Sequence, residues 1–167
     1  NRFDYDGDYG TVLNRFIMQA ATGHPLTVHG TGGQTRAFIN INDTVKCIDL
    51  AIKNPPTKDE KVKIFNQTTE QHTVSELAKK FAKITNAKIR YYINPRNEDR
   101  ANTLKVSSKS FSKLGLNPIK LNEGLISEIY DIAVKYKNNC DKSKIICSSV
   151  WKKDMVVDET GSENPIE

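Results

Sequence analysis

The order of apolar and polar residues along the chain predicts alternating helices and strands. Apolar positions recur every three or four residues, the period of an amphipathic helix, in residues 12–21, 45–52, 74–84 and 122–137. Shorter apolar runs bounded by glycine, proline or polar residues predict strands over residues 26–29, 36–41, 62–66 and 88–93. This alternation is typical of an α/β fold.

Start and stop signals define the ends of these helices. Thr11 suits an N-cap and Gly23 a stop for the first helix, Asn42 and Asp43 cap the second, and the sequence Thr-Val-Ser-Glu from Thr73 is a capping box. A short helix over residues 108–114 is stopped by Gly115. The side chains expected to face inward are Val45, Ile48, Ala51 and Ile52; Val74, Leu77, Phe81 and Ile84; and Leu125, Ile129, Ile132, Ala133 and Tyr136.

The glycine-rich stretch over residues 24–38 carries the candidate chemistry. It predicts a β-hairpin whose turn contains the glycines at positions 30, 32 and 33, because glycine reverses the backbone without strain. The reversal is expected to bring Thr27, His29, Gln34 and Arg36 together. A flat ring, hydroxyl and amide groups and a guanidinium suit a nucleotide. The alternative is a polar hairpin whose Arg36 pairs with a surface carboxylate.

Composition narrows the class of protein. The 167 residues carry a net charge of +5, but the lysines are scattered without an arginine-rich aromatic patch, so we expect no nucleic-acid partner. No run approaches the ~20 apolar residues of a membrane span. The three cysteines show no metal spacing, so we expect free thiols in the cytoplasm and no metal. The chain begins without methionine and reads as a piece of a longer protein; residues 154–167 are expected to form a flexible tail.

Residues 23–43 carry the pattern G-x-P-L-T-V-x-G-x-G-x-Q-T-R-x-F-I-x-I-x-D, which resembles the second half of extended short-chain dehydrogenases acting on nucleotide sugars. Within that family, further segments resemble UDP-sulfoquinovose synthases, as does Ala37 in place of the aspartate of most relatives. These segments are RFDYD (2–6), GTVLNRF (10–16), FNQTTEQ (65–71), NPRNE (94–98), VKYK (134–137) and SVWKK (149–153).

The resemblance implies that residues 1–153 are the C-terminal, substrate-binding portion of a Rossmann-type enzyme whose N-terminal, dinucleotide-binding half is not in this chain. In that family, NAD⁺ takes a hydride from C4 of UDP-glucose, water is eliminated across C5–C6, sulfite adds at C6 and the hydride returns. The catalytic residues and most of the NAD site belong to the other half, so the fragment alone is expected to be inactive. The full-length enzyme is expected to be a homodimer in the cytoplasm, or in a plastid stroma if the source is a photosynthetic eukaryote. Whether the sulfosugar is finally transferred to a lipid or to a glycan is left open.

The resemblance also assigns roles to residues of this chain. Arg36 and Arg96 stand where relatives clamp the pyrophosphate, and Gln34 is placed to reach ribose or phosphate. Thr27 and His29 lie on the strand that lines the uracil pocket, where relatives carry tyrosine or phenylalanine in place of His29. The remaining assignments are Leu13 and Asn14, which approach the nucleotide from the first helix, and Arg2, a sulfite- or sugar-facing group or an ordinary surface arginine.

Two other functions remain open at this point. A 4-epimerase or 4,6-dehydratase of the same superfamily is one, although Ala37 and the FNQTTEQ segment argue against it. A non-catalytic nucleotide-sugar-binding module is the other, because the chain contains neither a G-x-G-x-x-G loop that opens a helix nor a Tyr-x-x-x-Lys pair.

Overall fold

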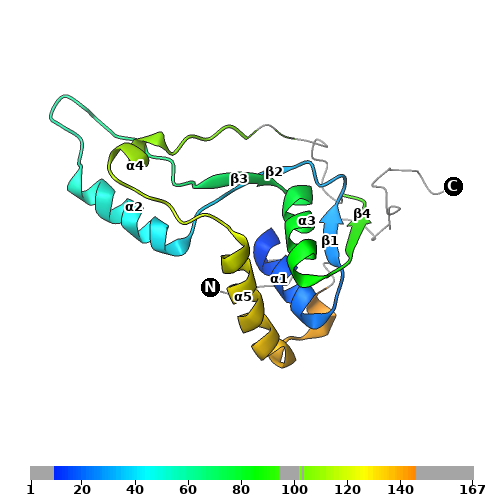
Figure 1. Cartoon of the computed structure of the whole chain (residues 1–167). Helices are drawn as coiled ribbons and strands as arrows, with labels where there is room; N and C mark the ends of the chain where they lie inside the picture. Colours follow the sequence, from blue (N-terminus) through cyan, green and yellow to red (C-terminus); the bar gives the residue numbers. More distant parts are fainter. Residues whose placement is uncertain (1–9, 95–101, 103, 146–167) are drawn as a thin grey trace. The chain divides into compact units, whose positions relative to one another are not determined.

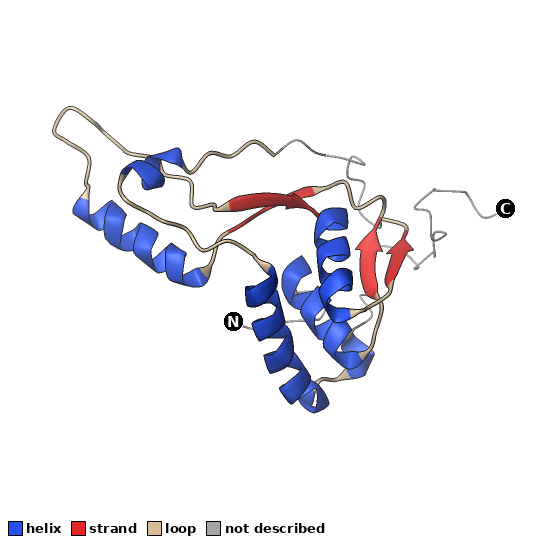
Figure 2. Ribbon diagram, viewed as in Figure 1, coloured by secondary structure: helices blue, strands red, loops and turns tan. Residues whose placement is uncertain are grey.

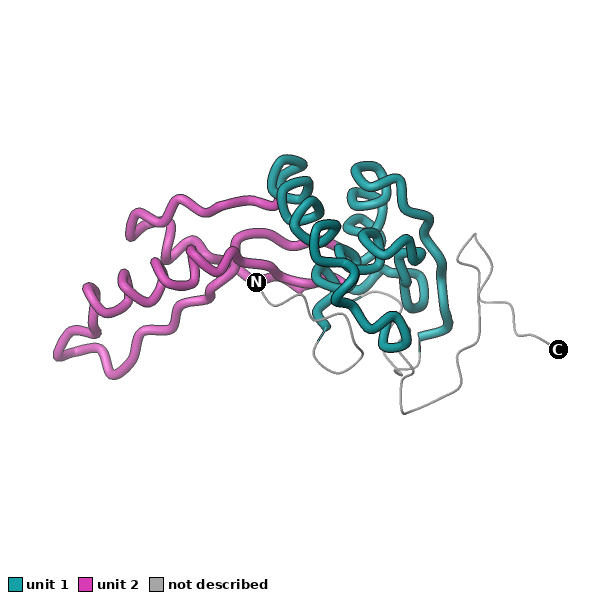
Figure 3. The backbone as a smooth tube through the Cα atoms, turned by 90° about the horizontal axis from the view of Figure 1, so that it is seen from below, with its two compact units in different colours: residues 1–34, 73–102, 122–167 teal, residues 35–72, 103–121 magenta. Residues whose placement is uncertain are grey.

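The computed structural model describes residues 10–94, 102 and 104–145. The chain divides into two compact units, coloured separately in Figure 3. Unit 1 comprises residues 1–34, 73–102 and 122–167, and unit 2 comprises residues 35–72 and 103–121. Helices and short strands alternate along the described part of the chain, which confirms the α/β class (Figures 1 and 2).

Unit 1 combines a parallel strand pair with three helices. Strands β1 (Leu26–His29) and β4 (Ile89–Tyr92) pair in parallel, with Leu26 opposite Ile89 and His29 opposite Tyr92. Helices α1 (Val12–Thr22), α3 (Val74–Thr85) and α5 (Glu123–Tyr136) pack against one another, and α1 and α3 also contact β1. The 3₁₀ turns η1 (Lys137–Asn139) and η2 (Lys142–Lys144) follow α5.

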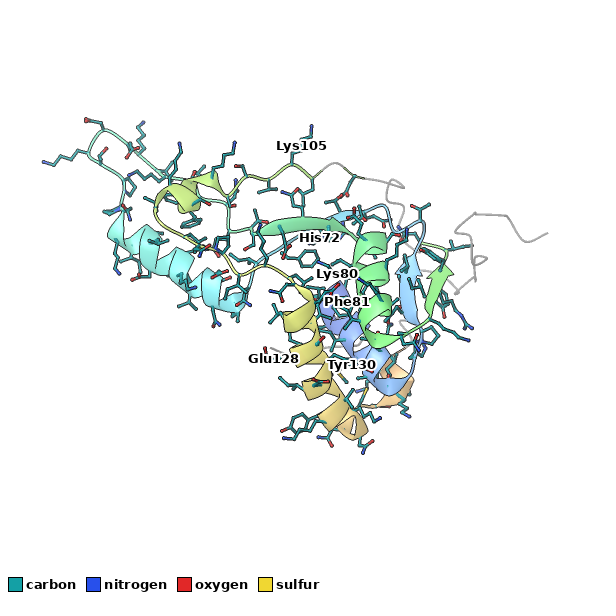
Figure 4. The ribbon with its side chains drawn as sticks, viewed as in Figure 1. His72, Lys80, Phe81, Lys105, Glu128 and Tyr130 are labelled. Carbon is teal, nitrogen blue, oxygen red and sulfur yellow. The ribbon has the colours of Figure 1, made fainter. Side chains whose placement is uncertain are left out.

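The core of unit 1 lies between these helices and β1. Phe16 of α1 and Phe81 of α3 are buried with their ring centroids 6.0 Å apart (Phe81 is labelled in Figure 4). Leu26 and Val28 are fully buried, whereas the alternate residues of β1 are half-buried. One face of the strand therefore closes the core and the other remains partly accessible.

Unit 2 is built around a second strand pair, β2 (Thr35–Phe38) with β3 (Glu70–Thr73). Helix α2 (Ile41–Lys53) and the short helix α4 (Lys109–Lys113) provide the core, in which Cys47, Phe111 and Leu116 are buried. The carboxylate of Asp43, also buried, accepts a hydrogen bond of 2.6 Å from the backbone nitrogen of Ile119. This bond fastens the first turn of α2 to the loop that follows α4.

The caps predicted from the sequence are largely confirmed. Helix α1 begins after Thr11 and ends at Gly23, which adopts the left-handed conformation (φ +79°). At α3 both halves of the capping box are present: Thr73 accepts from the nitrogen of Glu76, and the Glu76 carboxylate accepts from the nitrogen of Thr73. Helix α2 differs, because Asn40, rather than Asn42, is its N-cap.

The prediction of a hairpin over residues 24–38 is wrong. Strand β1 pairs with β4 and β2 pairs with β3, so the two strands flanking the glycines belong to different sheets. The predicted strand over residues 62–66 is not a strand, and β3 lies instead at Glu70–Thr73, where the sequence predicts none. Strand pairing explains both errors, since a ladder partner distant in sequence decides which extended segment becomes a strand.

The predicted buried face of α2 is mostly exposed. Of the side chains predicted to face inward, Val45, Ile48 and Ile52 are 61%, 51% and 73% exposed, although their spacing places them on one side of the helix. The fourth, Ala51, is partly buried against the core of unit 2. The core contacts come instead from the opposite side, through Asp43 and Cys47. In α5 the correction is smaller: Ile126 and Ala133 are buried, whereas Ile132 and Tyr136 are exposed.

Candidate functional site

The carboxyl ends of β1 and β4 form the centre of the candidate site in unit 1. The two strands run in parallel, so His29 and Tyr92 end them side by side, with ring centroids 6.2 Å apart. The nitrogen of Gly30 donates to the carbonyl oxygen of Tyr92 at 2.7 Å and continues the ladder past the last pair. Parallel α/β sheets bind ligands at this edge.

Thr27 precedes His29 by two residues and lies on the same, half-buried face of β1. Its hydroxyl oxygen accepts from the Gln19 amide nitrogen at 2.7 Å and from the Arg15 guanidinium at 3.1 Å. Its backbone nitrogen donates to the Gln19 amide oxygen at 3.0 Å. Residues of α1 thus hold Thr27 through three hydrogen bonds, and the fully buried Gln19 side chain satisfies a strand nitrogen.

The glycine loop after β1 accepts hydrogen bonds from the N-terminus of α3. The carbonyl oxygens of Gly32 and Gln34 accept from the nitrogens of Ser75 and Val74 at 2.9 and 3.1 Å. Gly32 has φ +70°, and a Cβ there would lie 2.7 Å from Val28 Cγ1 and 3.0 Å from the nitrogen of Ser75. With the capping box, these carbonyls use the first-turn donors of α3, so this helix N-terminus is not open to a phosphate.

The hydrogen bonds between the glycine loop and α3 decide whether this loop could bind the pyrophosphate of the expected cofactor, NAD. A dinucleotide pyrophosphate needs free backbone donors at a glycine loop and helix N-terminus, and the glycine loop of the described residues does not supply them. The geometry therefore does not fit an NAD pyrophosphate at this loop. That the dinucleotide site is formed mainly outside this chain stays a prediction.

The structure places the predicted site residues in three groups. Leu13, Asn14, Thr27, His29 and Gln34 belong to unit 1; the first four are half-buried and Gln34 is 5% exposed. The next group consists of Arg36 alone, which lies on β2 of unit 2 and donates to the carbonyl oxygen of Thr35 at 3.3 Å. The last group, Arg96 and Arg2, lies outside the described residues.

Sequence reasoning missed three residues that the fold brings to this site. Tyr92 stands beside His29 only because β4 pairs with β1, and no local pattern signals that pairing. Arg15 and Gln19 are four residues apart on α1, so they face the same side of the helix. The spacing of Arg15 and Gln19 beside the apolar positions of the helix could have indicated that both face the same neighbour.

Other candidate groups behave as structural residues. Cys47 is a free thiol, as predicted, and it is buried. Its burial is the main cause that raises its pKa, and the nearby Asp43 carboxylate adds to the effect. His72, labelled in Figure 4, lies on β3. Its Nε2 is 2.9 Å from the Glu70 carboxylate. Within residues 10–94, 102 and 104–145, no group of three potential metal ligands is found. Over the same described ranges, no helix has the length and apolar character that crossing a membrane requires.

Comparison with known proteins gives a consistent relationship. The profile of the NAD dependent epimerase/dehydratase family matches residues 1–66. Two relatives are the chloroplastic UDP-sulfoquinovose synthase of Spinacia oleracea, 44% identical over 92% of this chain and 33% of its own length, and the UDP-sulfoquinovose synthase of Sulfolobus acidocaldarius, 35% identical over 93% and 41%. The chain therefore spans one third to two fifths of these relatives.

The fold is likewise shared with solved structures. The crystal structure of UDP-glucuronic acid 4-epimerase from Bacillus cereus, in complex with UDP-glucuronic acid and NAD, aligns with 75% of this chain and 40% of its own at a TM-score of 0.57 and 23% identity. At that identity the likeness shows the fold alone. Taken with the family match and the two sulfoquinovose synthases, it leads to the conclusion that the chain belongs to the NAD dependent epimerase/dehydratase family.

Proposed function

We propose that this chain is the nucleotide-sugar-binding portion of a UDP-sulfoquinovose synthase. The net reaction joins UDP-glucose, sulfite and a proton to give UDP-6-sulfoquinovose and water. The observation that carries the proposal is the 44% identity to the spinach enzyme along 92% of the chain. The 35% identity to the Sulfolobus enzyme, over nearly the same span, supports it independently.

The geometry of unit 1 supports a binding role for the uridine end of the substrate. His29 and Tyr92 offer aromatic faces at the carboxyl ends of two parallel strands, which suits a planar base. Thr27 adds a hydroxyl on the same face. We assign uracil to this edge, with Leu13 and Asn14 of α1 and Gln34 of the glycine loop contributing further contacts to the nucleotide.

We assign the pyrophosphate to Arg36 and Arg96. The pyrophosphate is anionic, and guanidinium groups bind phosphate oxygens through paired, charge-assisted hydrogen bonds. Arg2 is assigned to the sugar or to sulfite, because the resemblance places its loop nearest the reaction centre. These three assignments rest on the position of each residue in the family pattern.

NAD⁺ is proposed as the catalytic cofactor of the longer protein, hereafter the full-length protein. The relative from Bacillus cereus was solved with NAD, whereas the glycine loop of this chain is closed to a pyrophosphate. We therefore assign the NAD site and the groups that perform the chemistry mainly to residues outside this chain. The same reasoning predicts that the 167-residue chain alone has no turnover.

The remaining proposals concern the assembly and location of the full-length protein. We propose a homodimer that acts on dissolved UDP-glucose and sulfite. The relative from spinach is named as chloroplastic, so a plastid stroma is the proposed location if the source is a photosynthetic eukaryote, and the cytoplasm otherwise.

The test is product identification with the full-length protein. UDP-glucose, sulfite and NAD⁺ are incubated with it, and mass spectrometry is expected to find a sulfonated sugar nucleotide that forms only when sulfite is present. Formation of a sugar epimer without sulfur would instead favour a 4-epimerase. Binding of UDP-glucose without any conversion would favour a non-catalytic module.

A further inference from the structure

The hydrogen bonds around Thr27 fix which way its hydroxyl group can act. A hydroxyl oxygen has two lone pairs and one hydrogen. In Thr27, the oxygen accepts from Gln19 Nε2 at 2.7 Å and from Arg15 Nη2 at 3.1 Å. Both lone pairs are therefore used, and the remaining function of this hydroxyl is to donate.

The direction of the Gln19 bond follows from the backbone. The two ends of a glutamine amide are assigned from their partners rather than seen directly. Here one end faces the backbone nitrogen of Thr27 at 3.0 Å, and because a backbone N–H only donates, that end is the oxygen. The end facing the Thr27 hydroxyl is then the NH₂ group, which only donates.

Arg15 reinforces the same direction. A guanidinium carries donors and no acceptor at any working pH, so its bond to Thr27 cannot reverse. Gln19 is fully buried and four residues further along α1, so both donors come from one side of one helix. The pair acts as a rigid clamp on one oxygen atom.

The Thr27 hydroxyl lies on the strand face that we assign to the base. Thr27 is half-buried, and no acceptor for its hydroxyl is found among the described residues. His29 lies two residues along the same face of β1, beside Tyr92. A base held against these rings would present its polar edge within reach of Thr27, because residues i and i+2 of a strand are ~6–7 Å apart.

We propose that Arg15 and Gln19 hold the Thr27 hydroxyl as a donor, so that this site selects a base carrying a carbonyl oxygen at that edge over a base carrying an amino group. Uracil and cytosine differ in this way at the 4-position, where uracil has an acceptor and cytosine a donor. An amino group would meet a hydroxyl oxygen whose lone pairs are already used. The inference rests on the proposed function, since it concerns the same nucleotide site.

The test compares UDP and CDP binding to the full-length protein by calorimetry. The parent protein is expected to bind UDP at least about tenfold more tightly than CDP, since a mismatched pair leaves a polar group unpaired. Thr27→Val removes the hydroxyl at nearly constant shape, so UDP affinity should fall about three- to tenfold and the preference for UDP should largely disappear. Thr27→Ser keeps the hydroxyl and should retain the preference.

Gln19→Glu tests the direction of the bond itself. The new carboxylate replaces the NH₂ donor with an acceptor, so the Thr27 hydroxyl would donate to this carboxylate and offer a lone pair to the ligand. Arg15 compensates the added charge from the same side of α1. The UDP/CDP ratio is then expected to move toward CDP. Asn138→Asp makes the same amide-to-acid change at an exposed position and is the matched control.

The outcomes separate this inference from the proposed function. An unchanged UDP/CDP ratio in Thr27→Val, while the parent protein binds UDP, would overturn the inference and leave the proposed function standing. A parent protein that binds neither nucleotide would overturn both. If Gln19→Glu does not fold, the comparison of Thr27→Val with Thr27→Ser decides.

Discussion

Replacing Gly32 by alanine tests the close contact between α3 and the glycine loop, the loop that follows β1. Gly32 has φ +70°, a conformation that costs an alanine about 1–2 kcal/mol. The added Cβ would also lie 3.0 Å from the backbone nitrogen of Ser75 and 2.7 Å from a methyl group of Val28. Because backbone and a fully buried side chain cannot yield cheaply, the loop must move away from α3.

That movement weakens the hydrogen bond from the nitrogen of Ser75 to the carbonyl oxygen of Gly32, now 2.9 Å long. A backbone hydrogen bond contributes about 0.5–1.5 kcal/mol, so with the conformational cost the total loss from Gly32→Ala is expected to be roughly 1.5–3.5 kcal/mol. Gly23→Ala is the matched control. Gly23 has φ +79° but nothing within 4 Å of its added Cβ, so only the conformational cost of about 1–2 kcal/mol applies.

The measurement is urea-induced unfolding of the full-length protein and of both variants, followed by circular dichroism. The free energy of unfolding should fall by about 1 kcal/mol more for Gly32→Ala than for Gly23→Ala. The affinity for UDP should also fall only in Gly32→Ala, because that loop follows the strand carrying His29. Equal destabilisation by the two alanines would refute the close packing of the loop against α3.

Three further predictions concern α2, the assigned arginines and the buried thiol. Ile52→Gln, at a side chain 73% exposed, is expected to change the free energy of unfolding by less than about 0.5 kcal/mol. It should nevertheless reduce aggregation of the 167-residue chain in light scattering, because an exposed apolar face favours association. Unchanged aggregation would mean that the exposed face of α2 does not drive this association. Arg36→Ala and Arg96→Ala should each weaken UDP binding about ten- to a hundredfold in calorimetry. Arg36→Lys should restore part of the UDP affinity, and the affinity for NAD⁺ should not change. Full UDP affinity in both alanine variants would place the pyrophosphate elsewhere. Because the pKa of Cys47 is raised in the folded protein, the unfolded chain loses this thiol proton at lower pH, and the free energy of unfolding should fall as pH rises above the ordinary thiol range. Cys47→Ser should remove this part of the fall, measured by urea unfolding at pH 7 and 9.5.

The local elements were readable from the sequence because their signals are local. The stop at Gly23 and the capping box from Thr73 to Glu76 depend on residues within one turn of a helix, and both occur as predicted. The burial of Cys47 could not be read in this way, because it lies on the side of α2 opposite to the apolar stripe that the sequence predicts to face inward. Thr27 and His29 were selected from the predicted hairpin, which is wrong, and they lie instead on the half-buried face of β1.

The tertiary structure alone decided what these elements pair with. The glycines at positions 30 and 32 suggested a turn between neighbouring strands, yet β1 takes its partner β4 from about sixty residues further along, and the loop carbonyls cap α3 instead. Strand partners compete through packing and long-range hydrogen bonds, which no local pattern encodes. The β1–β4 pairing places Tyr92 beside His29, and the packing of α1 brings Arg15 and Gln19 to the Thr27 hydroxyl. Which residues of this site are polar can be read directly from the sequence, whereas the packing of α1 and β4 against β1 decides which of their groups lie side by side.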